Sequence, residues 1–414
     1  MGKKIFENGL LIDGNGGEAK KDHIVVVDGN TIEYVGEKSG YSKTGDEEVV
    51  DVQGGTILPG LIDTHVHMMM EFMPVAKKLE MPFSLMYYNS AQYLKATLDA
   101  GITSVRDAAG TDLGVKQAVE KGLIRGPRLQ ISVNALTITG GHGDGYRESG
   151  NIIENLPSGY PGMPSGLCDG VEEVRKRTRE ILRAGADVIK VHATGGVLSA
   201  TDHPEFTQFS PEELKVIVEE GAFRKGVKVM AHAQGAEGIK NAVRTGIHSI
   251  EHGIFLDDEA IELMLKNGTY LVPTLLAPVA VLEMAEEGGM PAGAVAKSEE
   301  VIEVHKESFT KAYKAGVKIA MGTDAGVMKH GTNLRELGLM EEGGMSPMDT
   351  IVASTKTAAE CMGWGEKLGT IEQGKLADLI VVKGNPLEDI HSLADNDTIQ
   401  FVLKDGTTEK NLLG

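Results

Sequence analysis

Two periodicities alternate along the chain from residue 61 onward. Short apolar runs rich in β-branched residues are followed by longer segments with a helical spacing of apolar positions. The expected strands are 61–67, 101–107, 127–133, 186–192, 226–232, 247–252, 269–275 and 316–323. The expected helices are 86–100, 111–122, 171–185, 211–224, 235–245, 257–267, 293–315, 333–342 and 347–362. Strands that alternate with helices pair in parallel, so this pattern predicts an α/β fold, a (β/α)8 TIM barrel.

The two ends of the chain show a different pattern. Residues 1–59 and 363–414 contain short apolar runs separated by Asp-Gly and Gly-Gly pairs, which favour tight turns between strands. Neither end is long enough to bury a core alone. We therefore expect one discontinuous β-sandwich domain built from both ends, next to a barrel domain of residues 60–362.

Two long stretches interrupt the alternation. Residues 134–170 separate the third and fourth expected strands, and another stretch follows Pro273. Loops of this length in a compact domain are either functional lids or disordered. The first contains the sequence GGHGDGYR at 140–147, which places polar side chains on a glycine-rich backbone.

Composition and charge narrow the class of protein. Of the 414 residues, 41% are hydrophobic, and the formal net charge is −19. That charge repels phosphate backbones and anionic lipids, which argues against nucleic-acid and membrane partners. Two cysteines do not predict a disulfide framework, and no apolar run approaches the roughly 20 residues of a membrane span. The first residues lack the apolar segment of a signal peptide. We expect a cytoplasmic homo-oligomer that acts on a small molecule.

The candidate chemistry begins with the run LIDTHVH, which places His65 and His67 at the end of an apolar segment. Side chains on a strand alternate between faces, so the two imidazoles point the same way and form half of a metal site. Four further candidate ligands stand at or near the ends of later strands: Lys190, His232, His252 and Asp324. Catalytic groups of a (β/α)8 barrel come from the C-terminal ends of several strands. These six residues therefore predict one metal centre.

Lys190 requires a separate argument. In the alternative to a metal-binding role, the aliphatic part of its side chain packs on the strand and its ammonium reaches solvent. Next to divalent ions, burial and positive charge would lower its pKa and make the neutral amine accessible. A neutral amine can add carbon dioxide to form a carbamate, whose two oxygens can bridge two metal ions.

These residues resemble the amidohydrolase superfamily in its binuclear form. The segments GGTILPGLIDTHVH and GTIEQGKLADLIVV, on either side of the expected barrel, are typical of it. The motifs VHATGGVLSA, AHAQG, SIEHG and KAGVKIAMGTDAGVMKHGTN are similar to its imidazolonepropionase-like branch, in particular to Xaa-Pro dipeptidases and Xaa-Arg/Lys carboxypeptidases. The resemblance implies a hydrolase that cleaves an amide bond to a C-terminal amino acid, in a dipeptide or an N-acyl amino acid.

The resemblance also implies roles for the ligands. His65, His67 and Asp324 would hold the more buried metal ion, His232 and His252 the more exposed one, and carboxylated Lys190 would bridge both together with a hydroxide. Zinc is expected, because imidazole and carboxylate suit it and the reaction needs no redox chemistry. The hydroxide would attack the carbonyl carbon, and Asp324 would accept its proton and pass it to the leaving amine.

Five further residues are candidates for binding substrate. His142 matches the family's Gly-Gly-His pattern and would hold the carbonyl oxygen or the tetrahedral oxyanion. His192 shares the face of Lys190, where the family often has a small or apolar residue. Gln234 stands where dipeptidases of this branch are expected to carry a Tyr or His for the substrate carboxylate, which puts strict Xaa-Pro specificity in doubt. Arg147 and His330 are weaker candidates for that carboxylate.

Three alternatives stay open at this point. A mononuclear deaminase or imidazolonepropionase would not need Lys190. A binuclear hydrolase of another amide, a carbamate, an aryl amide or a phosphotriester would use the same centre, because loops choose among these bonds. A non-catalytic scaffold would be expected to lose ligands, and all six are present.

Overall fold

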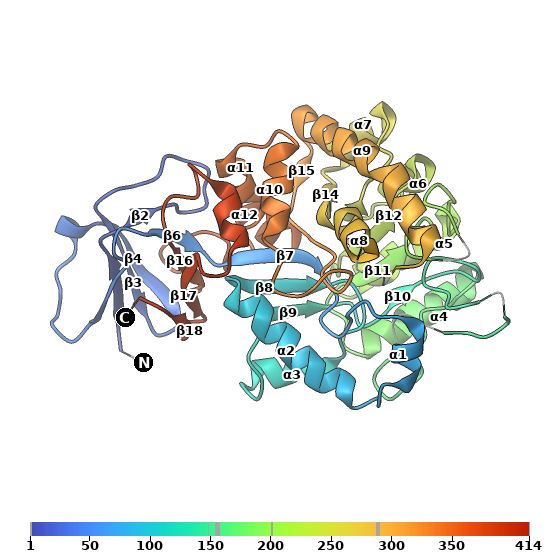
Figure 1. Cartoon of the computed structure of the whole chain (residues 1–414), viewed down its shortest axis with the longest axis horizontal. Helices are drawn as coiled ribbons and strands as arrows, with labels where there is room; N and C mark the ends of the chain where they lie inside the picture. The colour runs from blue at the N-terminus through green and yellow to red at the C-terminus, as the bar shows by residue number, and fades with distance from the viewer. Residues whose placement is uncertain (1, 148, 154–157, 200–201, 287–289, 414) are drawn as a thin grey trace.

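Parallel strands in two sheets lie at the middle of the molecule (Figure 1). The computed structural model describes residues 2–147, 149–153, 158–199, 202–286 and 290–413. One sheet contains β7 (Leu61–Val66), β8 (Ile102–Asp107) and β9 (Arg128–Ile131). The other contains β10 (Ala135–Leu136), β11 (Ile189–His192), β12 (Val229–Ala233), β13 (Ser249–His252), β14 (Tyr270–Val272) and β15 (Lys318–Ile319), in that order. Each of the eight expected strands is confirmed, and β10 was not expected.

Backbone hydrogen bonds connect the two sheets. The amide of Thr64 in β7 donates to the carbonyl of Met321 at 2.9 Å, and the amide of His67 donates to Ala325 at 2.7 Å. At the other edge, the amide of Asp187, just before β11, donates to the carbonyl of Ile131 in β9 at 2.7 Å. The end of the first central strand therefore lies against the segment that follows the last one.

Helices alternate with these strands as expected. The confirmed ones are α2 (Leu85–Asp99), α3 (Leu113–Glu120), α4 (Gly170–Arg183), α5 (Pro211–Phe223), α6 (Ala236–Arg244), α7 (Asp258–Asn267), α9 (Ala292–Ala315) and α10 (Arg335–Glu342). α5 shows why the sequence folds this way locally. The Ser210 hydroxyl accepts from the amide of Glu213, the Glu213 carboxylate accepts from the amide of Ser210, and Pro211 fits the first turn.

Three local expectations were wrong. The stretch after Pro273 contains a helix, α8 (Leu276–Glu286), and α1 (Val75–Glu80) was not expected. The expected helix 347–362 is two helices, α11 (Pro347–Ala353) and α12 (Lys356–Cys361). Between them the hydroxyls of Ser354 and Thr355 both donate to the carbonyl of Ile351, and Thr355 leaves the helical region with φ −132° and ψ −88°.

The chain ends form two further sheets, the first from N-terminal strands alone and the second from strands of both ends (Figure 1). β1 (Lys4–Glu7), β3 (His23–Asp28), β4 (Thr31–Glu37) and β5 (Glu48–Asp51) form the first sheet. β2 (Leu10–Leu11), β6 (Thr56–Pro59), β16 (Leu379–Val382), β17 (Ile399–Lys404) and β18 (Thr407–Asn411) form the second. Phe6 and Phe401, from opposite ends of the chain, meet edge to face at 5.4 Å in a shared buried cluster.

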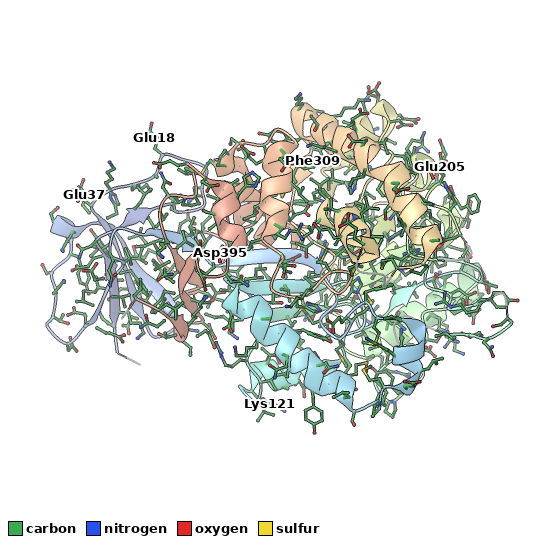
Figure 2. The ribbon with its side chains drawn as sticks, viewed as in Figure 1. Glu18, Glu37, Lys121, Glu205, Phe309 and Asp395 are labelled. Atoms are coloured by element: carbon green, nitrogen blue, oxygen red, sulfur yellow. The ribbon has the colours of Figure 1, made fainter. Side chains whose placement is uncertain are left out.

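Side chains divide between core and surface in the usual way (Figure 2). Glu37, Lys121 and Glu205 lie on the outside, whereas Phe309 of α9 is buried. Among the residues described, no helix is both long enough and apolar enough to cross a membrane.

Candidate metal centre and active site

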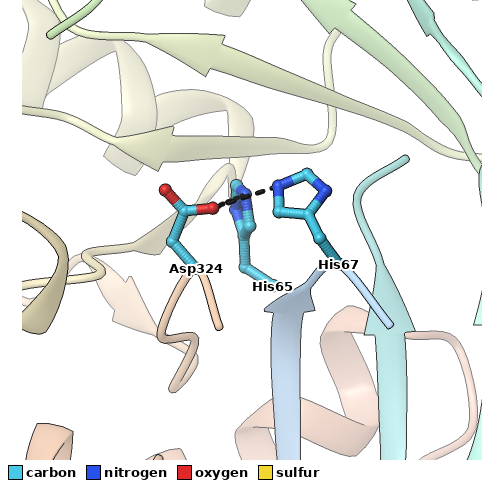
Figure 3. Close-up of side chains that lie close together, drawn as sticks. All are labelled: His65, His67 and Asp324. Atoms are coloured by element: carbon cyan, nitrogen blue, oxygen red, sulfur yellow. Dashed lines mark ion pairs between the residues drawn. The ribbon is translucent and has the colours of Figure 1, made fainter. Parts of the chain in front are cut away.

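The end of β7 brings two imidazoles to one carboxylate (Figure 3). His67 Nε2 lies 3.0 Å and His65 Nε2 lies 3.4 Å from Oδ1 of Asp324. Asp324 follows β15 on a left-handed backbone with φ 65°, and His252 at the end of β13 has φ 73°. Non-glycine residues seldom adopt such angles, and they gather at functional sites. His65, His67 and Asp324 form a group that could hold a metal ion.

The other expected ligands reach the same cavity, which has a volume of about 210 Å³. His252 lies close to two of them, with its ring centroid 5.0 Å from that of His65 and 4.6 Å from that of His232. All six expected ligands line the cavity: His65, His67, Lys190, His232, His252 and Asp324. Parallel pairing explains this meeting, because β11, β12 and β13 are neighbours whose carboxyl ends share one rim.

Each candidate histidine ligand is held by one of its two ring nitrogens. The partner groups are a carboxylate, two backbone carbonyls and a hydroxyl. The bonds are His65 Nδ1 to Glu251 Oε2 (2.8 Å), His67 Nδ1 to the carbonyl of Ala109 (2.9 Å), His232 Nε2 to the carbonyl of Gly195 (2.9 Å) and His252 Nδ1 to the hydroxyl of Thr274 (2.7 Å). Such bonds orient metal-binding histidines and leave the second nitrogen for the ion. The donor set therefore fits a metal centre.

Burial and charge set the protonation states of the candidate ligands, and most of these states suit cation binding. The exception is His67, whose pKa is lowered by burial but raised more by Asp324. Burial holds the pKa of His232 and of His252 well below the ordinary value, so both imidazoles are neutral near pH 7. Burial raises the pKa of Asp324, but His65 and His67 lower it more, so its pKa lies well below the usual range. Burial lowers the pKa of Lys190 to about 8, despite the opposing charges of Glu251 and Asp324. The neutral amine of Lys190 is thus accessible.

A buried ion pair lies beneath this group, and sequence analysis missed it. Arg106 Nη2 donates to Glu251 Oε1 at 2.9 Å, and the hydroxyl of Ser249 donates to the same oxygen at 2.5 Å. Arg106 and Glu251 are both at most 1% exposed. The other oxygen of Glu251 accepts from His65. The sequence signal for this ion pair was a charged residue within each of two strand motifs, Arg106 in SVRD and Glu251 in SIEHG.

His142 reaches the site from the long loop after β10. Its ring stacks on His232 with centroids 4.2 Å apart and meets the edge of His192 at 5.1 Å. Its Nδ1 lies 3.2 Å from the hydroxyl of Ser199 and 3.5 Å from Oδ2 of Asp202. These contacts leave Nε2 as the nitrogen for a substrate. Asp202 is buried and was not singled out from sequence, because it lies in a loop among other polar residues.

The remaining candidates divide into two groups. Arg147, His192 and Gln234 line the cavity. His330 is not among the residues that line it. The ring of His330 stacks on Tyr93 with centroids 4.5 Å apart, and its Nε2 donates to the carbonyl of Met70 at 2.8 Å. These contacts give His330 a packing role below the loop that follows β7.

The site could hold a metal ion, and comparison with known proteins gives the family of the chain. Residues 56–408 match the amidohydrolase family, and the chain belongs to this family. Ochratoxinase of Aspergillus niger is 37% identical to this chain over an alignment of 416 residues, which covers 97% of this chain and 85% of the ochratoxinase.

Two solved structures are similar over nearly their whole length. A Xaa-Pro dipeptidase with methionine bound in its active site has a TM-score of 0.88 and 37% identity, covering 98% of this chain and 99% of the dipeptidase. A prolidase in complex with N-methylphosphonate-L-proline has a TM-score of 0.91 and 36% identity, covering 99% of this chain and 100% of the prolidase. The predicted family is confirmed.

Proposed function

We propose that this protein is a zinc-dependent amidohydrolase that cleaves the amide bond between an acyl or aminoacyl group and a C-terminal amino acid. The observation that carries the proposal is the convergence of four histidines, Lys190 and Asp324 on one cavity, each histidine already held by one nitrogen. The names of the similar proteins, which include a dipeptidase and a prolidase, support an amino acid as the leaving group.

We further propose that the two central sheets form a closed (β/α)8 barrel and that the sheets from the chain ends form a separate β-sandwich domain. Hydrogen bonds between β7 and the segment after β15 support the closure. The cluster shared by Phe6 and Phe401 supports the second domain. The ligands would then stand at the C-terminal rim of the barrel, where enzymes of this fold place their chemistry.

Two divalent ions would be held by the six ligands, with His65, His67 and Asp324 on one ion and His232 and His252 on the other. Lys190, as a carbamate, would bridge them. When bound, the ions would lower the pKa of water towards neutrality and polarise the substrate carbonyl.

The residues of the chain then have separate tasks. Asp324 accepts the proton that water loses as its oxygen bonds to the carbonyl carbon, and it passes that proton to the amine nitrogen as the C–N bond breaks. His142, with its Nδ1–H directed at Asp202, donates from Nε2 as an imidazolium to the carbonyl oxygen as negative charge develops there. Arg147, which lines the same cavity, is the cation available for the substrate carboxylate, with His192 and Gln234 as neutral polar neighbours.

A substrate panel tests the proposal. Metal-loaded protein should hydrolyse N-acyl amino acids and dipeptides, and amidation of the substrate carboxylate should weaken binding because a buried partner loses its bond. His142→Ala should keep its metal content and lose roughly 10²- to 10³-fold in kcat. His391→Ala, at an exposed imidazole, is the matched control. Faster turnover of carboxylate-free amides, carbamates or phosphotriesters would refute the substrate class and leave the metal hydrolase standing.

A further inference from the structure

Lys297 on α9 binds backbone rather than solvent. Its ammonium donates to the carbonyls of Gly196 at 3.0 Å, Ser199 at 2.8 Å and Asp202 at 2.8 Å. An ammonium has three donors, so these bonds use all of them. The side chain is 16% exposed, and its distance to the Asp202 carboxylate is 4.0 Å. Three convergent carbonyls fix both the position of the cation and the path of the loop that supplies them.

That loop, residues 195–199 and 202, holds two imidazoles of the active site. The carbonyl of Gly195 accepts from His232 Nε2, and Ser199 and Asp202 face His142 Nδ1. The backbone itself packs against the rings. A Cβ atom at Gly196 would lie 2.3 Å from Cε1 of His142 and 2.8 Å from Cε1 of His232, distances that no side chain can occupy.

The helix that carries Lys297, α9, is anchored by hydrogen bonds from the same face. That face carries four residues spaced three or four positions apart, Lys297, Val301, His305 and Ser308. His305 Nε2 donates to the carbonyl of His252 at 3.0 Å, and the hydroxyl of Ser308 accepts from the amide of Leu256 at 3.2 Å. The helix therefore connects the end of β13 with the loop after β11.

We propose that Lys297 is a positioning residue of this active site, which holds the backbone of residues 195–199 and 202 closed around His142 and His232. The catalytic roles of these two imidazoles come from the proposed function, and this part of the proposal rests on it. The closure of the loop around the two rings does not depend on the proposed function. Without the ammonium, three carbonyls lose their common donor and the loop no longer fixes the stacked pair. The reaction should suffer in kcat more than in KM, because His142 acts on the developing charge rather than on the bound substrate.

The test uses Lys297→Met in the full chain, with Lys306→Met as the control. Lys306 lies on the same helix, and its exposed side chain pairs with Glu342 at 3.4 Å. Hydrogen exchange of the metal-free protein should show the amides of Gly195 and Gly196 exchanging at least tenfold faster in the Lys297 variant only. In the wild type these amides donate to the carbonyl of Phe206 at 2.9 Å and to Asp202 Oδ1 at 3.3 Å.

Metal-loaded Lys297→Met should lose roughly 10- to 100-fold in kcat, the range for a lost hydrogen bond to a charged group. Lys297→Arg keeps the charge but not the compact donor geometry, so intermediate values are expected. If Lys297→Met does not fold, the same exchange and kcat measurements on Lys297→Arg test the proposal. Unchanged exchange in a folded variant overturns the proposal, and so does faster exchange with an unchanged kcat. If the whole substrate panel is inert, the proposed function fails, while exchange still decides the closure.

Discussion

Replacing Glu251 by Gln should destabilise the protein strongly, although the substitution changes little in shape. The carboxylate accepts from Arg106, Ser249 and His65, and all four side chains are buried. An amide offers one oxygen in place of two and places an NH₂ group against one of these donors. The charge of Arg106 would stay buried without its counter-ion.

Two arguments give the size of the expected loss in the free energy of unfolding. Breaking a buried ion pair by removing one partner typically costs about 3–5 kcal/mol. Burial raises the pKa of Glu251, but Arg106 and His65 lower it more, from 4.5 to about 2, which corresponds to about 3 kcal/mol. A carboxylate with a lowered pKa contributes this stability above its unfolded value of 4.5 and loses it as pH falls towards 2. Near pH 7 the full loss is expected.

The assay is urea unfolding of the metal-free protein at pH 7, so that loss of metal does not enter. Glu283→Gln is the matched control, since Glu283 pairs with exposed Arg335 at 2.5 Å and exposed pairs contribute at most about 1 kcal/mol. Metal content of loaded samples should also fall in the Glu251 variant, because His65 loses its orienting bond. A loss of stability no larger than in the control would refute the reasoning.

Two further predictions concern other buried ionisable groups. Lys190→Met should reduce the metal content of loaded protein from two equivalents to one or less by elemental analysis, with exposed Lys228→Met unchanged; two retained equivalents would exclude Lys190 as a bridge. Burial raises the pKa of Glu336 from 4.5 to about 8, although it accepts from the amides of Leu275 and Leu276. The folded state then binds a proton that the unfolded state releases, so the free energy of unfolding should fall as pH rises between these values. Glu336→Gln should flatten this dependence in urea titrations at pH 5 and pH 8, and an unchanged slope would contradict it.

Most of the fold could be predicted from the sequence, because the signals for strands and helices are periodic and local. β-branched runs and capping residues such as Ser210 mark strand ends and helix starts whatever surrounds them. The same pattern predicted that His65, His67 and Asp324 would meet, because parallel strands bring their carboxyl ends to one rim. α8 was missed since it follows a proline-containing segment and buries apolar residues without a clear polar face.

The residues that support the candidate ligands could not be predicted in the same way. Lys297 looks like any exposed lysine of a helix in the sequence, and only the fold places the Gly196 carbonyl above it. Arg106 and Glu251 lie 145 positions apart, so neither motif alone indicates their ion pair. His330 stood in the sequence only as a weaker candidate, and in the structure its ring packs on Tyr93.

The pairing of β6 with β16 has a consequence for synthesis of the protein. The hydroxyl of Thr56 in β6 donates to the carbonyl of Gly384 at 2.6 Å across 328 positions of sequence. On a ribosome, β6 therefore emerges long before its partner exists and keeps an open edge and apolar residues such as Ile57 and Leu58 in the meantime. Such edges invite association between unfinished chains. Slow translation, or a ribosome stalled near the 3′ end of the mRNA, would prolong this exposure, so β6 is a segment of the nascent chain that a chaperone would protect.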